Sequence, residues 1–286
     1  MDKEKFISVL STLLEKPNTT NVEEGLSDDE YSELFKDYSD NIKYYNQTDK
    51  CLYRGIEKND PIFISKPVKR VSNPYSIKSI GNFYTLIMDN DPRWINWPKR
   101  SYSFICSNRI ESCEDYISSK GSVYRVFPLN NAVIATCNSN DIWEIVINRT
   151  TERLRFFDFQ KFGEMMVSVY QFLNKNPETA TYEELMSLNE PIDPEQFKDS
   201  LSIYDRLLIQ NINAKNEDVM QLLKSPKKYI EMHFDPKKLG FELIQYKELK
   251  NYKSSSEFWF SSEALFIRID AEINEKKTKE FLNSLF

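Results

Sequence analysis

An arginine in an apolar segment is the first residue that could carry chemistry. Arg54 stands in Leu52-Tyr53-Arg54-Gly55, a short run that is typical of a β-strand. A guanidinium is always charged and offers phosphate oxygens a planar fork of donors, and Gly55 would let a ligand approach the backbone. The alternative is a strand arginine that only extends its charge into solvent. The segment therefore predicts either a phosphate clamp or an ordinary strand surface.

A second segment, residues 98–107, carries serines at alternating positions. If this segment is a strand, Ser101, Ser103 and Ser107 lie on one side of it. Tyr102, Phe104 and Cys106 then lie on the opposite side. Small hydroxyls in a row can bond a ribose or orient a carboxylate. An ordinary solvent-facing row is the alternative.

Two carboxylates interrupt a late aromatic run. Glu257 and Glu263 lie within residues 256–267, which the pattern predicts as one strand. Cleavage of a glycosidic bond builds oxocarbenium character at the sugar, and a nearby carboxylate stabilises that charge. A carboxylate at an exposed strand end needs no such role. The late strand thus offers the carboxylate that glycosyl transfer requires.

The elements that must position these residues follow from hydrophobic periodicity. Short β-branched or aromatic runs predict strands within residues 51–56, 61–68, 101–107, 122–129, 131–137, 142–148, 241–246 and 257–270. Repeats of three and four predict helices at 4–16, from Ser27 to Ile42, within 108–121, at 162–173, 182–188, 194–210 and 216–224, and near the C-terminus. Strands, then helices, then strands again predict an α+β fold.

This order of elements also predicts the domain organisation. An N-terminal helical segment spans residues 1–48, and a β core spans 49–158 and 240–286. Residues 159–239 form a helical insertion in that core.

The composition excludes several function classes. The chain has 286 residues and a net charge of −6, with 44 acidic and 38 basic residues, which disfavours a basic nucleic-acid-binding module. Six glycines form neither a Walker A loop nor a dinucleotide-binding turn. No segment resembles a signal peptide or a membrane span, so we expect a soluble cytoplasmic protein.

The single histidine and the four cysteines are also informative. The cysteines, at positions 51, 106, 113 and 137, form no CxxC pair and lie far from His233 in the chain, so no metal site is expected. Serine or cysteine catalysis with a histidine base would have to rest on His233 alone. We expect His233 to be a structural residue beside a turn.

The order of an arginine strand, a serine strand and a carboxylate strand resembles the arginine–serine–glutamate class of ADP-ribosyltransferases. The chain is also similar to phage-associated proteins of this kind, in Pro98 to Ser107, in Pro128 with Asp141-Ile142-Trp143, and in Glu257-Phe258-Trp259. The resemblance implies a split β core, with NAD⁺ as substrate and no metal. It covers residues 50–148 and 240–270, and leaves the helical insertion unexplained.

Carried over by position, the resemblance assigns roles to single residues. Arg54, with Gly55, would bind the NAD⁺ phosphates. Ser103 would organise the nicotinamide-ribose pocket, together with Ser101, and Glu257 would be the catalytic glutamate. Glu263 is the second candidate for that carboxylate. Two further aromatic residues could stack on the nicotinamide or belong to the core: Phe83 and Tyr84.

Two positions depart from the family pattern. Cys106-Ser107-Asn108 occupies the place of the usual Ser-Thr-Ser triplet, and Ser255 stands where a Glu or Gln precedes the catalytic glutamate. In the family that upstream residue orients an acceptor arginine, so its absence argues against an arginine acceptor. The histidine–tyrosine–glutamate branch is disfavoured, because the only histidine is remote from the first strand.

The function expected from this resemblance is mono-ADP-ribosylation of a macromolecule in the bacterial cytosol, with release of nicotinamide. The acidic balance favours a protein acceptor, while RNA and DNA stay open. Composition agrees with a phage or an anti-phage origin, as a toxin or a defence enzyme. Two alternatives remain: an NAD⁺ glycohydrolase on the same fold, and a non-catalytic phage–host interaction protein.

Overall fold

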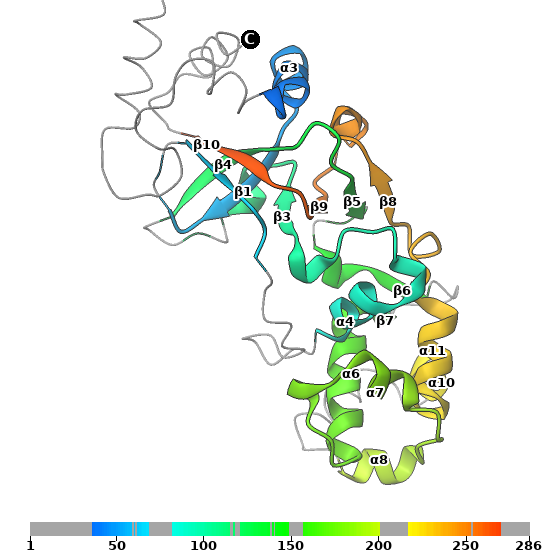
Figure 1. The fold of residues 1–286 in the computed structure, drawn as a ribbon. Helices are drawn as coiled ribbons and strands as arrows, with labels where there is room; N and C mark the ends of the chain where they lie inside the picture. The colour runs from blue at the N-terminus through cyan, green and yellow to red at the C-terminus, as the bar shows by residue number, and fades with distance from the viewer. Residues whose placement is uncertain are drawn as a thin grey trace, which may run out of the picture. The chain divides into compact units, whose positions relative to one another are not determined.

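The computed structural model describes residues 36–58, 60, 62–68, 82–114, 117, 121–137, 139, 141–148, 157–200, 217–252 and 254–269 (Figure 1). The expected helices at 4–16 and near the C-terminus lie outside the described residues. Contacts divide the chain into two compact units. Unit 1 comprises residues 1–68, 102–140 and 243–286, and unit 2 comprises 69–101 and 141–242.

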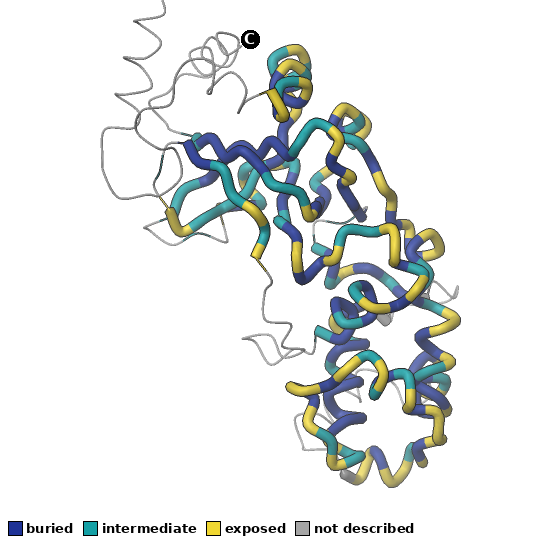
Figure 2. Tube along the Cα trace, viewed as in Figure 1, coloured by how far each residue is buried: buried dark blue, intermediate teal, exposed yellow. Residues whose placement is uncertain are grey.

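Unit 1 is built on one large sheet. Its eight strands lie in the order β2-β10-β4-β1-β3-β9-β5-β8. Their bounds are β1 Leu52–Ile56, β2 Ile62–Ser65, β3 Phe104–Ser107, β4 Ser122–Pro128, β5 Ile134–Cys137, β8 Glu242–Ile244, β9 Glu257–Phe260 and β10 Ala264–Arg268. Figure 2 shows the dense burial along the neighbouring strands β4 and β10. The mixture of helices with this antiparallel sheet confirms the α+β class.

Helix α3, Ser39–Thr48, packs on the sheet through Tyr45, whose ring meets Phe127 of β4 edge-on at 5.8 Å. The buried side chain of Asn41 donates from Nδ2 to the carbonyl of Pro128 at 2.8 Å. Both contacts join the helix to the end of β4. A short helix, α5 (Glu111–Glu114), follows β3 within the segment 108–121 that was expected to be helical.

The sheet opens between two of its central strands. β1 pairs with β4 over five residues, and β3 pairs with β9 over four. Between β1 and β3 the register contains one pair, Tyr53 opposite Ser107. The two halves of the sheet therefore separate next to Arg54.

The late aromatic run forms two strands and not the single one that alternation predicted. β9 lies between β3 and β5, whereas β10 lies between β2 and β4. The intervening residues 261–263 carry the chain from one half of the sheet to the other. Three consecutive polar residues, Ser261, Ser262 and Glu263, mark this turn in the sequence, but the prediction included them in one strand.

The serine-rich segment 98–107 is also only partly a strand. Arg100–Tyr102 form a 3₁₀ turn, and β3 begins at Phe104. The expected alternation therefore does not extend back to Ser101. Because a 3₁₀ turn places side chains about 120° apart, it breaks the two-residue period.

Unit 2 is helical around α6, Phe159–Phe172. Asp158 caps this helix by accepting the N–H of Lys161 at 2.8 Å. The remaining helices are α4 Phe83–Asn90, α7 Tyr182–Ser187, α8 Pro194–Ser200, α10 Glu217–Lys224 and α11 Pro226–His233. The single histidine ends α11, just before a turn, as expected.

The boundaries of unit 2 differ from the expected insertion at 159–239. Residues 142–148 form a 3₁₀ turn and strand β6, Val146–Asn148, which pairs with β7, Phe157–Asp158, in a separate two-stranded sheet. The N–H of Phe159 bonds the carbonyl of Ile145, so this hairpin continues directly into α6. Aromatic packing of α4 on α6 adds residues before 101 to the same unit.

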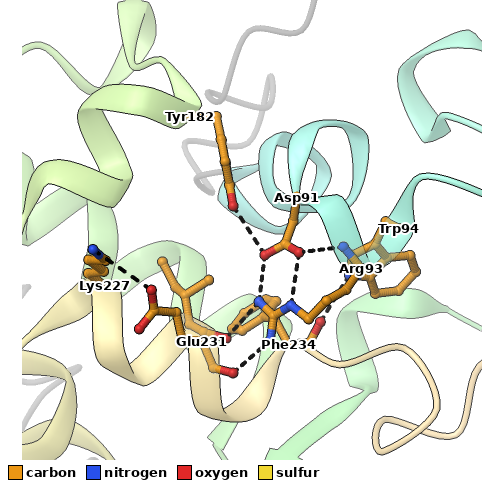
Figure 3. Close-up of polar contacts among 8 residues, drawn as sticks. Asp91, Arg93, Trp94, Tyr182, Lys227, Glu231 and Phe234 are labelled. Atoms are coloured by element: carbon orange, nitrogen blue, oxygen red, sulfur yellow. Dashed lines mark hydrogen bonds and ion pairs between the residues drawn. The ribbon is translucent and has the colours of Figure 1, made fainter.

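A polar cluster joins the end of α4 to α7 and α11 (Figure 3). Arg93 forms a hydrogen-bonded ion pair with Asp91 and donates to the carbonyls of Ile230 and Glu231 near the end of α11. Tyr182 donates its hydroxyl at 3.2 Å to Oδ2 of Asp91, an oxygen that also accepts a bond from Arg93. Burial favours the neutral acid, but the bonds from Arg93 outweigh it and lower the pKa of Asp91. The cluster is a structural tie within unit 2.

No helix in the described ranges is long and apolar enough to cross a membrane.

Candidate functional site

The three strands expected to carry the chemistry are consecutive neighbours in the sheet. β1 carries Arg54, β3 ends at Ser107, and β9 begins at Glu257, in the order β1-β3-β9. These residues are separated by up to two hundred positions in the sequence. The sheet topology thus brings together the arginine strand, the serine strand and the carboxylate strand.

Glu257 faces Ser107 across the β3–β9 pair. The two residues are opposite each other in the register, so their side chains share one side of the sheet. Tyr53 of β1 is opposite Ser107 and joins the same row. Glu257 is only 8% exposed, and its N–H bonds the carbonyl of Ser139 at 2.8 Å. Glu257 is therefore buried at the start of its strand, level with the pair that joins β1 to β3.

Ser103, the serine preferred from the sequence, lies at the other end of the same strand pair. Its hydroxyl bonds that of Ser261, just after β9, at 2.9 Å. Since Phe104 pairs with Phe260, Ser103 is separated from Glu257 by the length of the strand. The structure thus brings Ser107, and not Ser103, to Glu257. Ser107 was part of the serine row, but its position at the strand end could be known only once the register was known.

Arg54 reaches into the gap between β1 and β3. Its guanidinium donates to the backbone carbonyl of Ile105, and its Cζ lies 5.9 Å from the Phe104 ring centre. Carbonyls of a strand point sideways within the sheet, so the guanidinium occupies the place that a ladder bond would fill. Among the described residues, no carboxylate forms an ion pair with Arg54.

Alternation sets Arg54 and Glu257 on different sides of the sheet. Tyr53 shares a side with Ser107 and Glu257, and Arg54 is the next residue along β1. The contact of Arg54 with Phe104 agrees with this, since Phe104 is an odd number of residues from Ser107. The register alone does not gather the arginine and the glutamate on one surface.

Gly55 packs closely against the chain that follows β3. A Cβ at this position would lie 2.5 Å from Ile117 and 2.6 Å from the carbonyl oxygen of Cys113, so the chain at α5 fills the space. The thiol of Cys113 is protonated at neutral pH, because burial raises its pKa to about 11.

Phe83 and Tyr84 belong to the aromatic core of unit 2, which is one of the two roles expected for them. They are 0% and 2% exposed. Phe83 packs on Tyr170 at 5.1 Å, and Tyr84 is stacked on Phe159 at 5.3 Å. Buried rings of this kind present no face to a ligand.

Ser101 also belongs to unit 2, where its N–H bonds the carboxylate of Asp89 at 3.2 Å. Burial raises the pKa of Asp89, and the hydrogen bonds from Ser101 work in the opposite direction. The backbone of Ser101 therefore binds the Asp89 carboxylate of α4 within unit 2.

Glu263, the second candidate carboxylate, lies in the turn between β9 and β10. It accepts the hydroxyl of Tyr38 at 2.8 Å and lies 3.5 Å from the ammonium of Lys66. These partners tie it to the far half of the sheet. Its surroundings explain Glu263 as a structural residue.

Comparison of the chain with protein-family models, curated proteins and solved structures gave no match. Among the described residues, no group of three or more His, Cys, Asp or Glu side chains could hold a metal ion.

Proposed function

We propose that unit 1 has an ADP-ribosyltransferase-like fold, binds NAD⁺ at the opening between β1 and β3, and transfers ADP-ribose to a macromolecular acceptor. The observation that carries the proposal is the adjacency of β1, β3 and β9 with Ser107 opposite Glu257. Arg54 adds a cation without an acidic partner among the described residues, at the edge of that opening.

In the proposed reaction the bond between the ribose C1′ and the nicotinamide nitrogen breaks, and nicotinamide leaves with the bonding electrons. The Glu257 carboxylate stabilises the positive charge that develops on the ribose. A nucleophilic atom of the acceptor then bonds C1′ and loses its proton to solvent. The Ser107 hydroxyl, opposite Glu257, orients the carboxylate or a ribose hydroxyl.

The Arg54 guanidinium would bind the pyrophosphate with charge-assisted hydrogen bonds. Because alternation sets Arg54 and Glu257 on different sides of the sheet, binding of one dinucleotide by both residues requires the Arg54 side chain to leave its contact with Ile105. The carbonyl of Ile105 is the protein partner from which the guanidinium would turn towards the phosphates.

A second candidate function is supported by the same alternation. If Arg54 serves only to bind the Ile105 carbonyl, then Arg54, Ser107 and Glu257 do not form one site. Unit 1 would then be a non-catalytic interaction module. The two functions differ in a single property, which is whether the chain binds NAD⁺ at all.

Incubation with labelled NAD⁺ and a bacterial lysate tests the proposal. The wild-type chain is expected to label protein or nucleic acid, and Glu257→Gln is expected to abolish the label. Free ADP-ribose without labelled macromolecule would identify a glycohydrolase. A folded wild-type chain that neither binds nor consumes NAD⁺ would instead support the interaction module.

A further inference from the structure

Asn108 directly follows β3, and its side chain binds the chain segment just before Glu257. Its Nδ2 donates to the carbonyls of Tyr252 at 3.2 Å and Ser254 at 2.9 Å. Its Oδ1 accepts the N–H of Ser256 at 3.0 Å. A primary amide both donates and accepts hydrogen bonds through one planar group. The Asn108 side chain can therefore bind two carbonyls and one N–H of the segment at the same time.

The segment before Glu257 depends on such side-chain bonds because β9 begins only at Glu257. Ser255 bonds the hydroxyl of Ser112 in α5 at 3.0 Å, and Ser256 is fully buried. Of these contacts, those of Asn108 reach three backbone groups and come from the residue next to Ser107. Asn108 therefore links the position of Ser107 to that of Glu257.

We propose that Asn108 is a positioning residue, which fixes the Glu257 carboxylate opposite Ser107 by binding backbone groups of Tyr252, Ser254 and Ser256. This inference rests on the proposed function and names the device that orients its carboxylate. Loss of the amide leaves NAD⁺ binding in place, because Asn108 bonds only the backbone before Glu257. It displaces the group that must meet the developing charge, and small displacements of such a group are costly.

Asn108→Asp is the sharpest substitution, because it keeps the shape and turns the donor towards two carbonyls into an acceptor. Asn41→Asp is a matched control in the same unit. Asn41 also donates Nδ2 to two carbonyls, of Pro128 at 2.8 Å and Leu129 at 3.4 Å, but at the end of β4. Each variant is purified as the full chain, and steady-state NAD⁺ consumption and amide hydrogen exchange are measured.

For Asn108→Asp we expect kcat to fall about 10- to 100-fold with KM for NAD⁺ within about twofold of wild type. Amide exchange at Ser256 and Glu257 should rise about tenfold, from local opening of the segment. Asn41→Asp should raise exchange near Pro128 and leave kcat within about twofold, since it is remote from the carboxylate.

Faster exchange at Ser256 with an unchanged kcat would overturn the positioning role and leave the proposed function standing. Unchanged amide exchange at Ser256 and Glu257 in Asn108→Asp would show that Asn108 does not hold this segment, and would overturn the inference. An equal loss of kcat in both asparagine variants would also overturn the inference, because it would reflect general destabilisation. If Asn108→Asp raises amide exchange as expected but the wild-type chain does not turn over NAD⁺, the proposed function is overturned. The catalytic role of Asn108 is then overturned with it.

Discussion

Ser107 and Glu257 lie directly opposite each other on neighbouring antiparallel strands, although they are 150 positions apart in the sequence. Side chains of directly opposite residues are close enough to interact across a sheet. The hydroxyl of Ser107 also accepts the N–H of Arg109 at 3.1 Å, which fixes the serine at the end of β3. This pair is the core of the candidate site, and the first prediction concerns it.

Ser107→Ala should lower kcat about tenfold, because the loss of one hydrogen bond of about 1.4 kcal/mol in the transition state is a factor of ten. Ser103→Ala should leave kcat nearly unchanged, since its partner is Ser261 at the other end of the strand. Steady-state assays of both variants with NAD⁺ check this. A larger fall in kcat for Ser103→Ala than for Ser107→Ala would contradict the choice of Ser107 from the strand register. It would indicate Ser103 as the serine of the pocket.

Arg54→Ala should raise KM for NAD⁺ about 10- to 100-fold, since hydrogen bonds to a charged group contribute about 1.5–3 kcal/mol. Arg54→Lys should recover only part of the affinity, because an ammonium lacks the planar fork of donors. Lys66→Ala, which removes an exposed cation from the same unit, is the control. Titration calorimetry with NAD⁺ gives the affinities. Equal binding by wild type and Arg54→Ala would show that Arg54 is not a phosphate ligand.

Gly55→Ala should destabilise unit 1 by about 1–3 kcal/mol through overpacking. The added methyl group would meet the carbonyl oxygen of Cys113 at 2.6 Å, and a backbone atom cannot turn aside as a side chain can. Denaturant unfolding of the variant measures the loss. An unchanged stability, together with weaker NAD⁺ binding, would mean that the glycine serves a ligand after all.

Much of the fold followed from sequence periodicity, and the parts that did not have physical reasons. The strands at Leu52–Ile56 and Ser122–Pro128 were predicted because their apolar runs are bounded by turn residues. The break between β9 and β10 was missed because the aromatic and aliphatic residues on both sides of Ser261 and Ser262 were taken as one run. Phe83 and Tyr84 were taken as possible ligand contacts because one sequence does not reveal which aromatic residues pack on Phe159 and Tyr170.

The candidate site shows the same limit. The residue types on the three strands were predicted from the chain, and the pairing that selects Ser107 depends on contacts between remote segments. Asn108 was noted only as part of the segment that replaces the usual triplet, because its hydrogen bonds to Tyr252, Ser254 and Ser256 depend on the tertiary structure. Register and long-range hydrogen bonding are tertiary properties, which local patterns do not contain.

The ion pair of unit 2 gives a prediction on pH. The pKa of Asp91 is lowered in the folded chain, because Arg93 outweighs the effect of burial. A lowered carboxyl pKa contributes stability above the unfolded value of about 3.9, and that contribution is lost as the pH falls through the folded value. Asp91→Asn should therefore be less stable than wild type at pH 7, and the difference should shrink below about pH 4. Denaturant unfolding of both proteins from pH 7 to pH 3 measures it, and a difference that grows in acid would contradict the assigned role of the pair.

The most direct test of the central claim is release of nicotinamide from NAD⁺ by the purified chain, with Glu257→Gln and Glu263→Gln compared with wild type. Both substitutions remove a carboxylate from unit 1, but Glu263 is tied to Tyr38 and Lys66 away from the β3–β9 pair. The account predicts release by wild type and by Glu263→Gln, and a loss of about a hundredfold or more in Glu257→Gln. Equal release by all three proteins, or none by a folded wild-type chain, would contradict it.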